Sequence, residues 1–154
     1  MNDAKRVGHA VDVFRRLAPI RGDYATLPVW EGFNWAECAA SLGSVRLYLV
    51  VFRSLRRETA DADKLTEYDD RAHREVGHGA GLLHYFKGEA TDRRECLSFC
   101  LWESQGQALE AIRRPHHAAA AALASEMYES YELERYNVLI REREGEALVF
   151  EQIS

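Results

Sequence analysis

Residues 95–104 read ECLSFCLWES, and this stretch decides the fold. Read as a strand, it places Leu97, Phe99 and Leu101 on one face and Cys96, Ser98, Cys100 and Trp102 on the other. A strand with one face in water alternates apolar with polar residues, and this one does not. We therefore expect both faces of its sheet to be covered.

The segments around this strand predict the rest of the body. Ser104 and Gln107 have the spacing of a capping box, which starts a helix. Pro115 divides the helical region, because proline suits the first turn of a helix and not its middle. Dense β-branched and aromatic runs predict strands, and apolar residues at three- and four-residue steps predict helices. The expected elements are strands at 46–52, 82–90, 95–103, 131–140 and 147–153, and helices at 61–76, 105–113 and 115–128.

This order of elements, βαββαβ with a tail, is that of the ferredoxin-like α+β fold, an antiparallel sheet with both helices on one side. Residues 45–154 form this body in our interpretation, and residues 1–44 form a helical N-terminal extension. The extension is predicted to hold a helix over 3–18 and a short helix over 35–42, separated by prolines and glycines.

The second face of the sheet needs a cover of its own, because two helices cover only one face. The first strand is also apolar on both sides: Leu47, Leu49 and Val51 oppose Tyr48, Val50 and Phe52. The simplest cover is the same face of a second copy, so we expect a homodimer through the sheet faces. The alternative is a monomer whose extension folds over this face.

Composition limits the classes of function. A chain of 154 residues predicts one compact domain. Its formal charge of −5 argues against nucleic acid or an anionic membrane as the main partner. No apolar run is long enough to span a membrane, and the N-terminus lacks the apolar core of a signal peptide. Three cysteines are too few for a disulfide framework and fit a reducing cytoplasm, where we expect the protein.

Two short motifs carry a family resemblance. Trp102-Glu103-Ser104 ends a strand, and Arg114-Pro115-His116-His117 follows in the next helical region. This pattern resembles that of the antibiotic biosynthesis monooxygenases, a group within the dimeric α+β barrel superfamily. The resemblance implies a dimer with a small-molecule cavity between sheet and helices in each subunit. The superfamily includes cofactor-free quinone-forming monooxygenases, haem-degrading enzymes, isomerases and proteins without known activity, so the fold does not choose among them.

The residue pattern of the haem-degrading members is missing. They resemble one another in an Asn on the first strand, and in a Trp and an axial His in the helices after the WES motif. Here Ala111 and Ala121 stand at the two helix positions, and residues 46–54 contain no Asn. We therefore expect no cofactor, and haem held by another histidine is the alternative.

His84 is the candidate general base, because Leu82 and Phe86 on its face of the strand would place a titratable imidazole in an apolar cavity. The alternative is a hydrogen-bonded histidine in the core or in an interface. His116, at the start of a helix, is a second catalytic candidate. Packing on the helices is the alternative for Trp102. The expected substrate-binding residues are Trp102, Phe86, Ser98, Cys100 and Tyr48, an aromatic lining with a few polar groups.

A metal site is not expected. Asp69 and His73 share a helix face, but a third ligand from His78 lies beyond Gly77. The predicted function is binding of a small apolar or aromatic molecule, with metal-free oxidation or isomerisation of it if the protein is an enzyme. The alternatives are a non-catalytic ligand-binding or regulatory dimer, and a haem protein with His84 or His116 as axial ligand.

Overall fold

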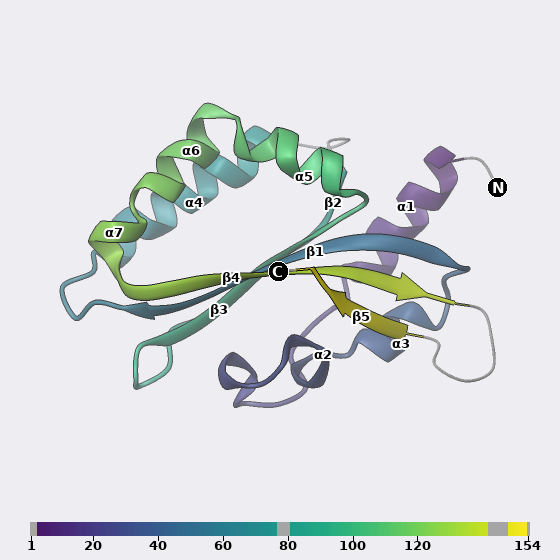
Figure 1. Ribbon diagram of the computed structural model, residues 1–154, viewed down its shortest axis with the longest axis horizontal. Helices are drawn as coiled ribbons and strands as arrows, with labels where there is room; N and C mark the ends of the chain where they lie inside the picture. The colour runs from purple at the N-terminus through teal and green to yellow at the C-terminus, as the bar shows by residue number, and fades with distance from the viewer. Residues whose placement is uncertain (1–2, 77–80, 142–147, 154) are drawn as a thin grey trace.

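An antiparallel sheet forms the centre of the protein, in the strand order β2-β3-β1-β4-β5 (Figure 1). The computed structural model describes residues 3–76, 81–141 and 148–153 of the chain. Its strands are β1 (Val45–Arg56), β2 (Leu82–Lys87), β3 (Glu95–Trp102), β4 (Tyr128–Ile140) and β5 (Leu148–Gln152). The order of the first four is the ferredoxin-like one, so the predicted α+β fold is confirmed.

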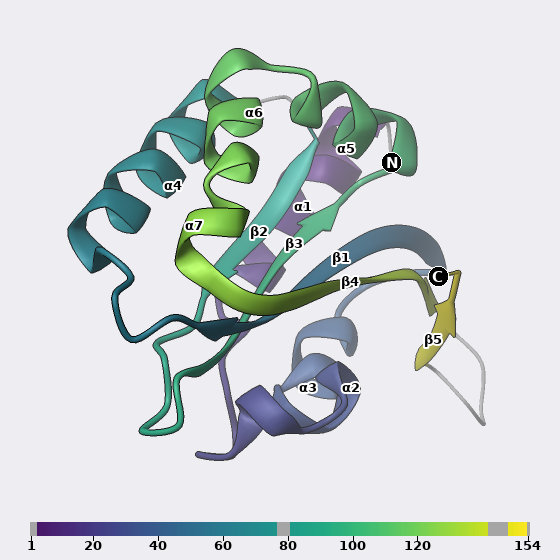
Figure 2. The same ribbon diagram turned by 60° about the vertical axis from the view of Figure 1, so that its left-hand side comes forward.

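Helices α4 (Ala62–Val76), α5 (Gln105–Ile112), α6 (Pro115–Ala122) and α7 (Ala124–Met127) lie on one face of the sheet (Figures 1 and 2). The Ser104 hydroxyl accepts a hydrogen bond from the Gln107 amide at 3.4 Å, as the capping box predicts. In a full capping box the Gln107 side chain would bond back to the Ser104 backbone amide. Here its Oε1 instead accepts from the Ser104 hydroxyl at 2.9 Å. Pro115 is the first residue of α6, where its missing amide proton costs nothing.

The N-terminal extension provides the elements on the opposite face. It holds α1 (Asp3–Phe14), the 3-10 helix η1 (Tyr24–Thr26), α2 (Val29–Gly32) and α3 (Trp35–Ala39). In Figure 1, α2 and α3 lie below the sheet, opposite α4 and α6. The first helix and α3 are shorter than predicted, and α2 was not predicted. Within the described ranges, no helix combines the length and the apolar character that crossing a bilayer requires.

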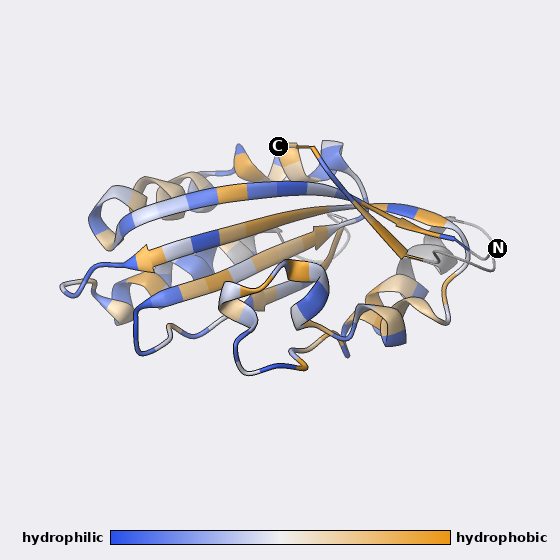
Figure 3. Ribbon diagram, turned by 60° about the horizontal axis from the view of Figure 1, so that its bottom comes forward, coloured by the Kyte–Doolittle hydropathy of each residue, from blue (hydrophilic) through white to orange (hydrophobic). Residues whose placement is uncertain are grey.

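Extension and sheet share one hydrophobic core. Trp35 is 2% exposed, and its indole Nε1 donates a hydrogen bond to the Val29 carbonyl oxygen at 2.8 Å. Figure 3, turned toward this side, shows β1 and β3 hydrophobic along most of their length. Apolar burial of this kind is the main favourable term in folding. The core includes Phe14, Val29, Phe33 and Trp35 from the extension and Leu47, Leu49, Val51, Leu97, Phe99 and Leu101 from the sheet.

The second face of the sheet is therefore covered, as its apolar strands predict, and the cover is the extension. This is the alternative to the second copy that we expected first. A homodimer through the sheet faces would have to displace α2 and α3 from the shared core. The homodimer through the sheet faces stays a prediction.

Candidate functional site

The two faces of the sheet divide the predicted binding residues into two groups. Trp102, Tyr48, Ser98 and Cys100 lie on the side of the helices, where Tyr48 pairs with Trp102 across β1 and β3. Trp102 and Tyr48 are each 3% exposed and pack against alanines of α5. Burial this complete leaves these two rings no open surface for a ligand, in agreement with the packing alternative for Trp102.

His84 and Phe86 lie on the side of the extension. A β-bulge between Leu82 and His84 adds one residue to β2, so Leu82 faces the helices while His84 and Phe86 face the extension. The ring centroid of Phe86 lies 4.9 Å from that of Phe33 in the extension. His84 and Trp102 therefore lie on opposite faces of the sheet, and ligand binding by these residues stays a prediction.

His84 is half-buried, and its ring centroid lies 6.1 Å from that of Phe99. Burial lowers the pKa of His84, so the imidazole is neutral at neutral pH. A neutral imidazole is able to accept a proton, but Ser98 and Cys100 lie across the sheet from it. The role of His84 as a general base stays a prediction.

The remaining histidines do not combine with His84 into one site. His116 is exposed at the start of α6, on the helix side, so a single haem cannot take both His84 and His116 as axial ligands. The side chains of His73 and His117, and all of His78, lie outside the described part of the chain. The described residues therefore do not test haem binding by a histidine, nor a metal site formed by Asp69, His73 and His78.

The centre of the helix side is packed less tightly than the extension side. On the extension side, Leu49, Val51 and Leu97 are completely buried. Their neighbours on the helix side, Val50 and Cys100, are only half-buried although they lie on central strands. In Figure 1, α4 and α6 run side by side, and these two helices pack mainly on each other. The side chains at the centre of this face therefore keep access to solvent or to a ligand.

Asp69 on α4 acts on several polar groups of this face. Burial raises the pKa of the Tyr85 hydroxyl, and the Asp69 carboxyl group raises it further. The same causes, in the same order, raise the pKa of Cys100 to about 12 and that of Tyr128 to about 12. Asp69 Oδ2 lies 3.8 Å from Lys87 Nζ. We call Asp69, Tyr85, Cys100 and Tyr128 the helix-side cluster.

Two polar atoms are buried at one end of β1. Ser54 Oγ and Arg56 Nε make no hydrogen bond to any part of the chain that the structure describes. Arg56 lies close enough to Tyr128 to affect its pKa, so this end of β1 adjoins the helix-side cluster. An unsatisfied buried polar group costs about 1–3 kcal/mol. A polar molecule bound here would remove part of that cost.

The helix-side cluster combines donors with one acceptor. Because their pKa values are raised, Tyr85, Tyr128 and Cys100 keep their protons at neutral pH and can donate hydrogen bonds. Cys100 is therefore a thiol rather than a nucleophilic thiolate. The Asp69 carboxyl group supplies the acceptor. With Val50 beside them, these groups suit a molecule that has an apolar body and an oxygen substituent.

Asp69 and Tyr85 were not among the sequence-predicted site residues. Asp69 follows Leu65 by four positions and precedes Ala72 by three, so it lies on the apolar side of α4. A carboxylate among the apolar residues of one helix face was the feature of the sequence that could have identified Asp69 as a site residue. Tyr85 had no such signal, because simple alternation from Leu82 places it on the wrong face.

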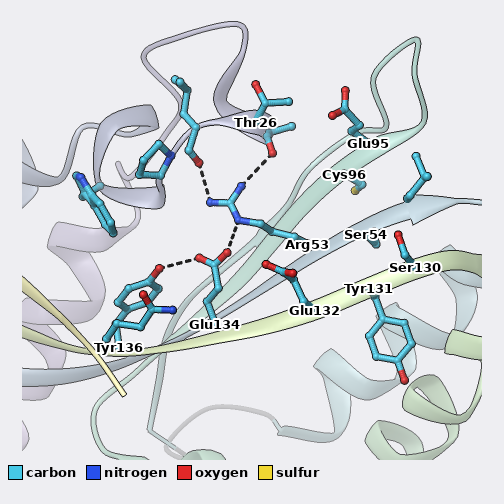
Figure 4. Close-up of a pocket in the computed structure, with 16 residues that line it drawn as sticks. Thr26, Arg53, Ser54, Glu95, Cys96, Ser130, Tyr131, Glu132, Glu134 and Tyr136 are labelled. Carbon is cyan, nitrogen blue, oxygen red and sulfur yellow. Dashed lines mark hydrogen bonds and ion pairs between the residues drawn. The ribbon is translucent and has the colours of Figure 1, made fainter. Parts of the chain in front are cut away.

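A pocket of about 690 Å³ opens on the extension side (Figure 4). Arg53 forms part of its wall, and its Nε donates a hydrogen bond to Glu134 Oε2 at 2.5 Å. Its Nη1 donates to the Ala25 carbonyl oxygen at 3.0 Å, and its Nη2 donates to the Leu27 carbonyl oxygen at 2.6 Å. The Tyr136 hydroxyl donates to Glu134 Oε1 at 2.7 Å. Arg53 thus ties the extension to the sheet, and the predicted substrate-binding residues lie elsewhere.

Comparison with known proteins identifies a family and a fold. The family model described as PB2B2.08-like matches residues 5–152. No curated protein is significantly similar to the chain. Among solved structures, the chain is similar to a conserved protein from Methanosarcina mazei (17% identity, TM-score 0.51, 63% of this chain and 93% of that one). It is also similar to protein SO0527 from Shewanella oneidensis (16% identity, TM-score 0.53, 62% of this chain and 93% of that one).

A putative antibiotic biosynthesis monooxygenase from Chloroflexus aurantiacus is also similar (14% identity, TM-score 0.48, 64% of this chain and 97% of that one). It bears the name of the group that the Trp102-Glu103-Ser104 motif resembles. At these identities the likeness concerns the fold alone. The Methanosarcina mazei and Shewanella oneidensis structures are covered almost completely, while more than a third of this chain lies outside the match, so the chain adds a substantial segment to the shared fold.

Proposed function

Because the chain belongs to the PB2B2.08-like family, whose description specifies no activity, we propose a function from the site itself. The protein binds a small aromatic molecule that carries a hydroxyl or carbonyl group, on the helix side of the sheet beneath α4. The observation that carries this proposal is the helix-side cluster. Tyr85 pairs with Cys100 across β2 and β3, and the Asp69 carboxyl group raises the pKa of Tyr85, Cys100 and Tyr128.

The surroundings of the cluster support an aromatic ligand. The Phe52 ring centroid lies 5.1 Å from that of Tyr128, and Val50 is half-buried on the same face. Apolar walls with a few directed polar groups are typical of small-molecule sites. The buried Arg56 Nε has no hydrogen-bond partner within the described part of the chain, and Arg56 lies close enough to Tyr128 to affect its pKa. It therefore favours a ligand with a polar substituent.

Titration with 2-naphthol, a neutral aromatic alcohol at neutral pH, tests the proposal. We expect saturable binding, followed by nuclear magnetic resonance shifts of the intact protein. Tyr85→Phe removes one hydroxyl and should weaken binding about two- to tenfold, the value of one hydrogen bond. Tyr24→Phe is the matched control, because Tyr24 packs in the core on the other face of the sheet. Equal affinities for the two variants, or no binding by the native protein, would contradict the proposal.

Oxidation of the bound molecule is the second candidate, and the position of Asp69 favours it. Proton transfer from a phenolic hydroxyl to the Asp69 carboxylate would prepare an electron-rich ring for reaction with dioxygen. With 1-naphthol, one dioxygen would give 1,4-naphthoquinone and one water. We expect the native protein to consume oxygen in the presence of 1-naphthol. The Asp69→Asn variant should still bind 1-naphthol but should consume no oxygen. Binding without oxygen consumption would leave a ligand-binding protein.

A further inference from the structure

We propose that the pocket on the extension side binds an organic cation, meaning an ammonium or amidinium group on an apolar or aromatic body. None of the four residues of the helix-side cluster lines this pocket, so the proposal does not depend on the proposed function. Its volume of about 690 Å³ is that of a site for a small organic molecule.

The charge of the lining favours a cation. The lining contains three carboxylates, from Glu95, Glu132 and Glu134, and one guanidinium, that of Arg53, so it has a net charge of −2. The ion pair between Arg53 and Glu134 is half-buried, with the two side chains 20% and 14% exposed. The Arg53 guanidinium therefore already binds Glu134 and the carbonyl oxygens of the extension. Glu95 and Glu132 keep negative charge for a ligand.

Glu132 is the carboxylate best placed to receive a cation. It stands directly opposite Arg53 in the pairing of β1 with β4, yet the guanidinium donates to Glu134 two residues farther along. No other residue in the described ranges forms a hydrogen bond or ion pair with the Glu132 side chain. In Figure 4, Glu132 and Glu134 both rise from β4 toward Arg53, whereas Tyr131 points away. Glu132 therefore offers, within the described ranges, an unpaired carboxylate at the exposed wall of the pocket.

Trp30 of α2 supplies an aromatic surface in the same lining. Its side chain is 45% exposed, in contrast to the buried Trp35. The indole nevertheless has a fixed position, because its ring centroid lies 6.0 Å from that of Tyr136 and 6.0 Å from that of Phe150. An exposed indole near carboxylates attracts organic cations through the ring face. Leu27 and Pro28 add apolar surface for the rest of the molecule.

A metal ion is a poorer occupant. Over the described ranges, no group of three or more histidine, cysteine, aspartate or glutamate side chains is arranged to hold one. A hard cation also gains nothing from an indole face, and it prefers several converging oxygen ligands. The lining instead combines separated carboxylates with an aromatic and apolar wall, which suits a cation that has an organic body.

Three probes of similar shape and different charge test this inference: 2-phenylethylammonium, 2-phenylethanol and 3-phenylpropanoate. Each is titrated into the intact protein at low salt, with binding followed by nuclear magnetic resonance shifts and by indole fluorescence. We expect the ammonium to bind at least severalfold more tightly than the alcohol, and the carboxylate to bind least. Added salt should weaken the ammonium alone, because its preference is electrostatic.

Two glutamate variants locate the site. Glu132→Gln should weaken ammonium binding about three- to fivefold, the range for one solvent-accessible ion pair. Glu129→Gln removes the same charge from the same strand outside the pocket and should leave the affinity unchanged. Trp30→Leu should also weaken the ammonium more than the alcohol. Equal binding of ammonium and alcohol, equal effects of the two glutamate variants, or no ammonium binding in the millimolar range would overturn the inference.

Discussion

At the scale of single residues, His84 makes stability depend on pH. Burial lowers its pKa in the folded protein, so below the unfolded value of about 6.5 the unfolded chain binds the proton more readily. The free energy of unfolding should therefore fall from about pH 7 to about pH 5. In the His84→Gln variant, this fall in the free energy of unfolding should be smaller. Urea unfolding at several pH values measures the difference. His116→Gln, at an exposed position, is the control, and parallel profiles for native protein and His84→Gln would contradict the prediction.

At the scale of elements, the end of β2 depends on a glycine. A Cβ at Gly88 would lie 2.1 Å from the Leu97 carbonyl oxygen, which accepts the Gly88 amide hydrogen at an N–O distance of 3.1 Å. Gly88→Ala should therefore force the backbones of β2 and β3 apart and destabilise the protein by about 1–3 kcal/mol. Chemical denaturation measures this change.

Gly106 in α5 is the matched control for the Gly88 substitution. A Cβ there has no atom within 4 Å, so nothing opposes the higher helix propensity of alanine. Gly106→Ala should leave stability unchanged or raise it by up to about 1 kcal/mol. Equal losses in the two alanine variants would mean that the close contact at Gly88 is not what limits β2.

At the scale of the whole molecule, the shared core predicts that extension and sheet unfold together. Trp35→Ala should lower the free energy of unfolding by about 3–5 kcal/mol, because it removes a large side chain that is 2% exposed. Trp30→Ala, at a 45% exposed side chain, should cost about 1 kcal/mol or less. Circular dichroism and tryptophan fluorescence should report one transition at the same urea concentration. Two separate transitions, with only the first shifted in Trp35→Ala, would show that the extension is an independent unit.

Part of the candidate site was already visible in the sequence. Alternation along residues 95–102 places Ser98 and Cys100 on the side of the sheet where the structure has them. Tyr85 was not predictable, because the bulge that turns it toward Asp69 depends on how β2 pairs with β3. In the sequence, Asp69 stood out only as a carboxylate among the apolar residues of α4. Its effect on the pKa of Tyr85 depends on the packing of α4 over the sheet.

By itself, the sequence determined the order of strands and helical regions after residue 44, the two covered faces of the sheet, the cap at Ser104 and the break at Pro115. These features follow from residue periodicity and from local backbone chemistry, which act within a few residues of one another. Only the tertiary structure decided that the extension covers the second face and that Arg53 holds it there through the carbonyl groups of Ala25 and Leu27. The physical reason is that the hydrophobic effect is not directional, so any apolar segment of suitable shape could cover this face of the sheet. Which segment does so depends on contacts between residues that are distant in the chain.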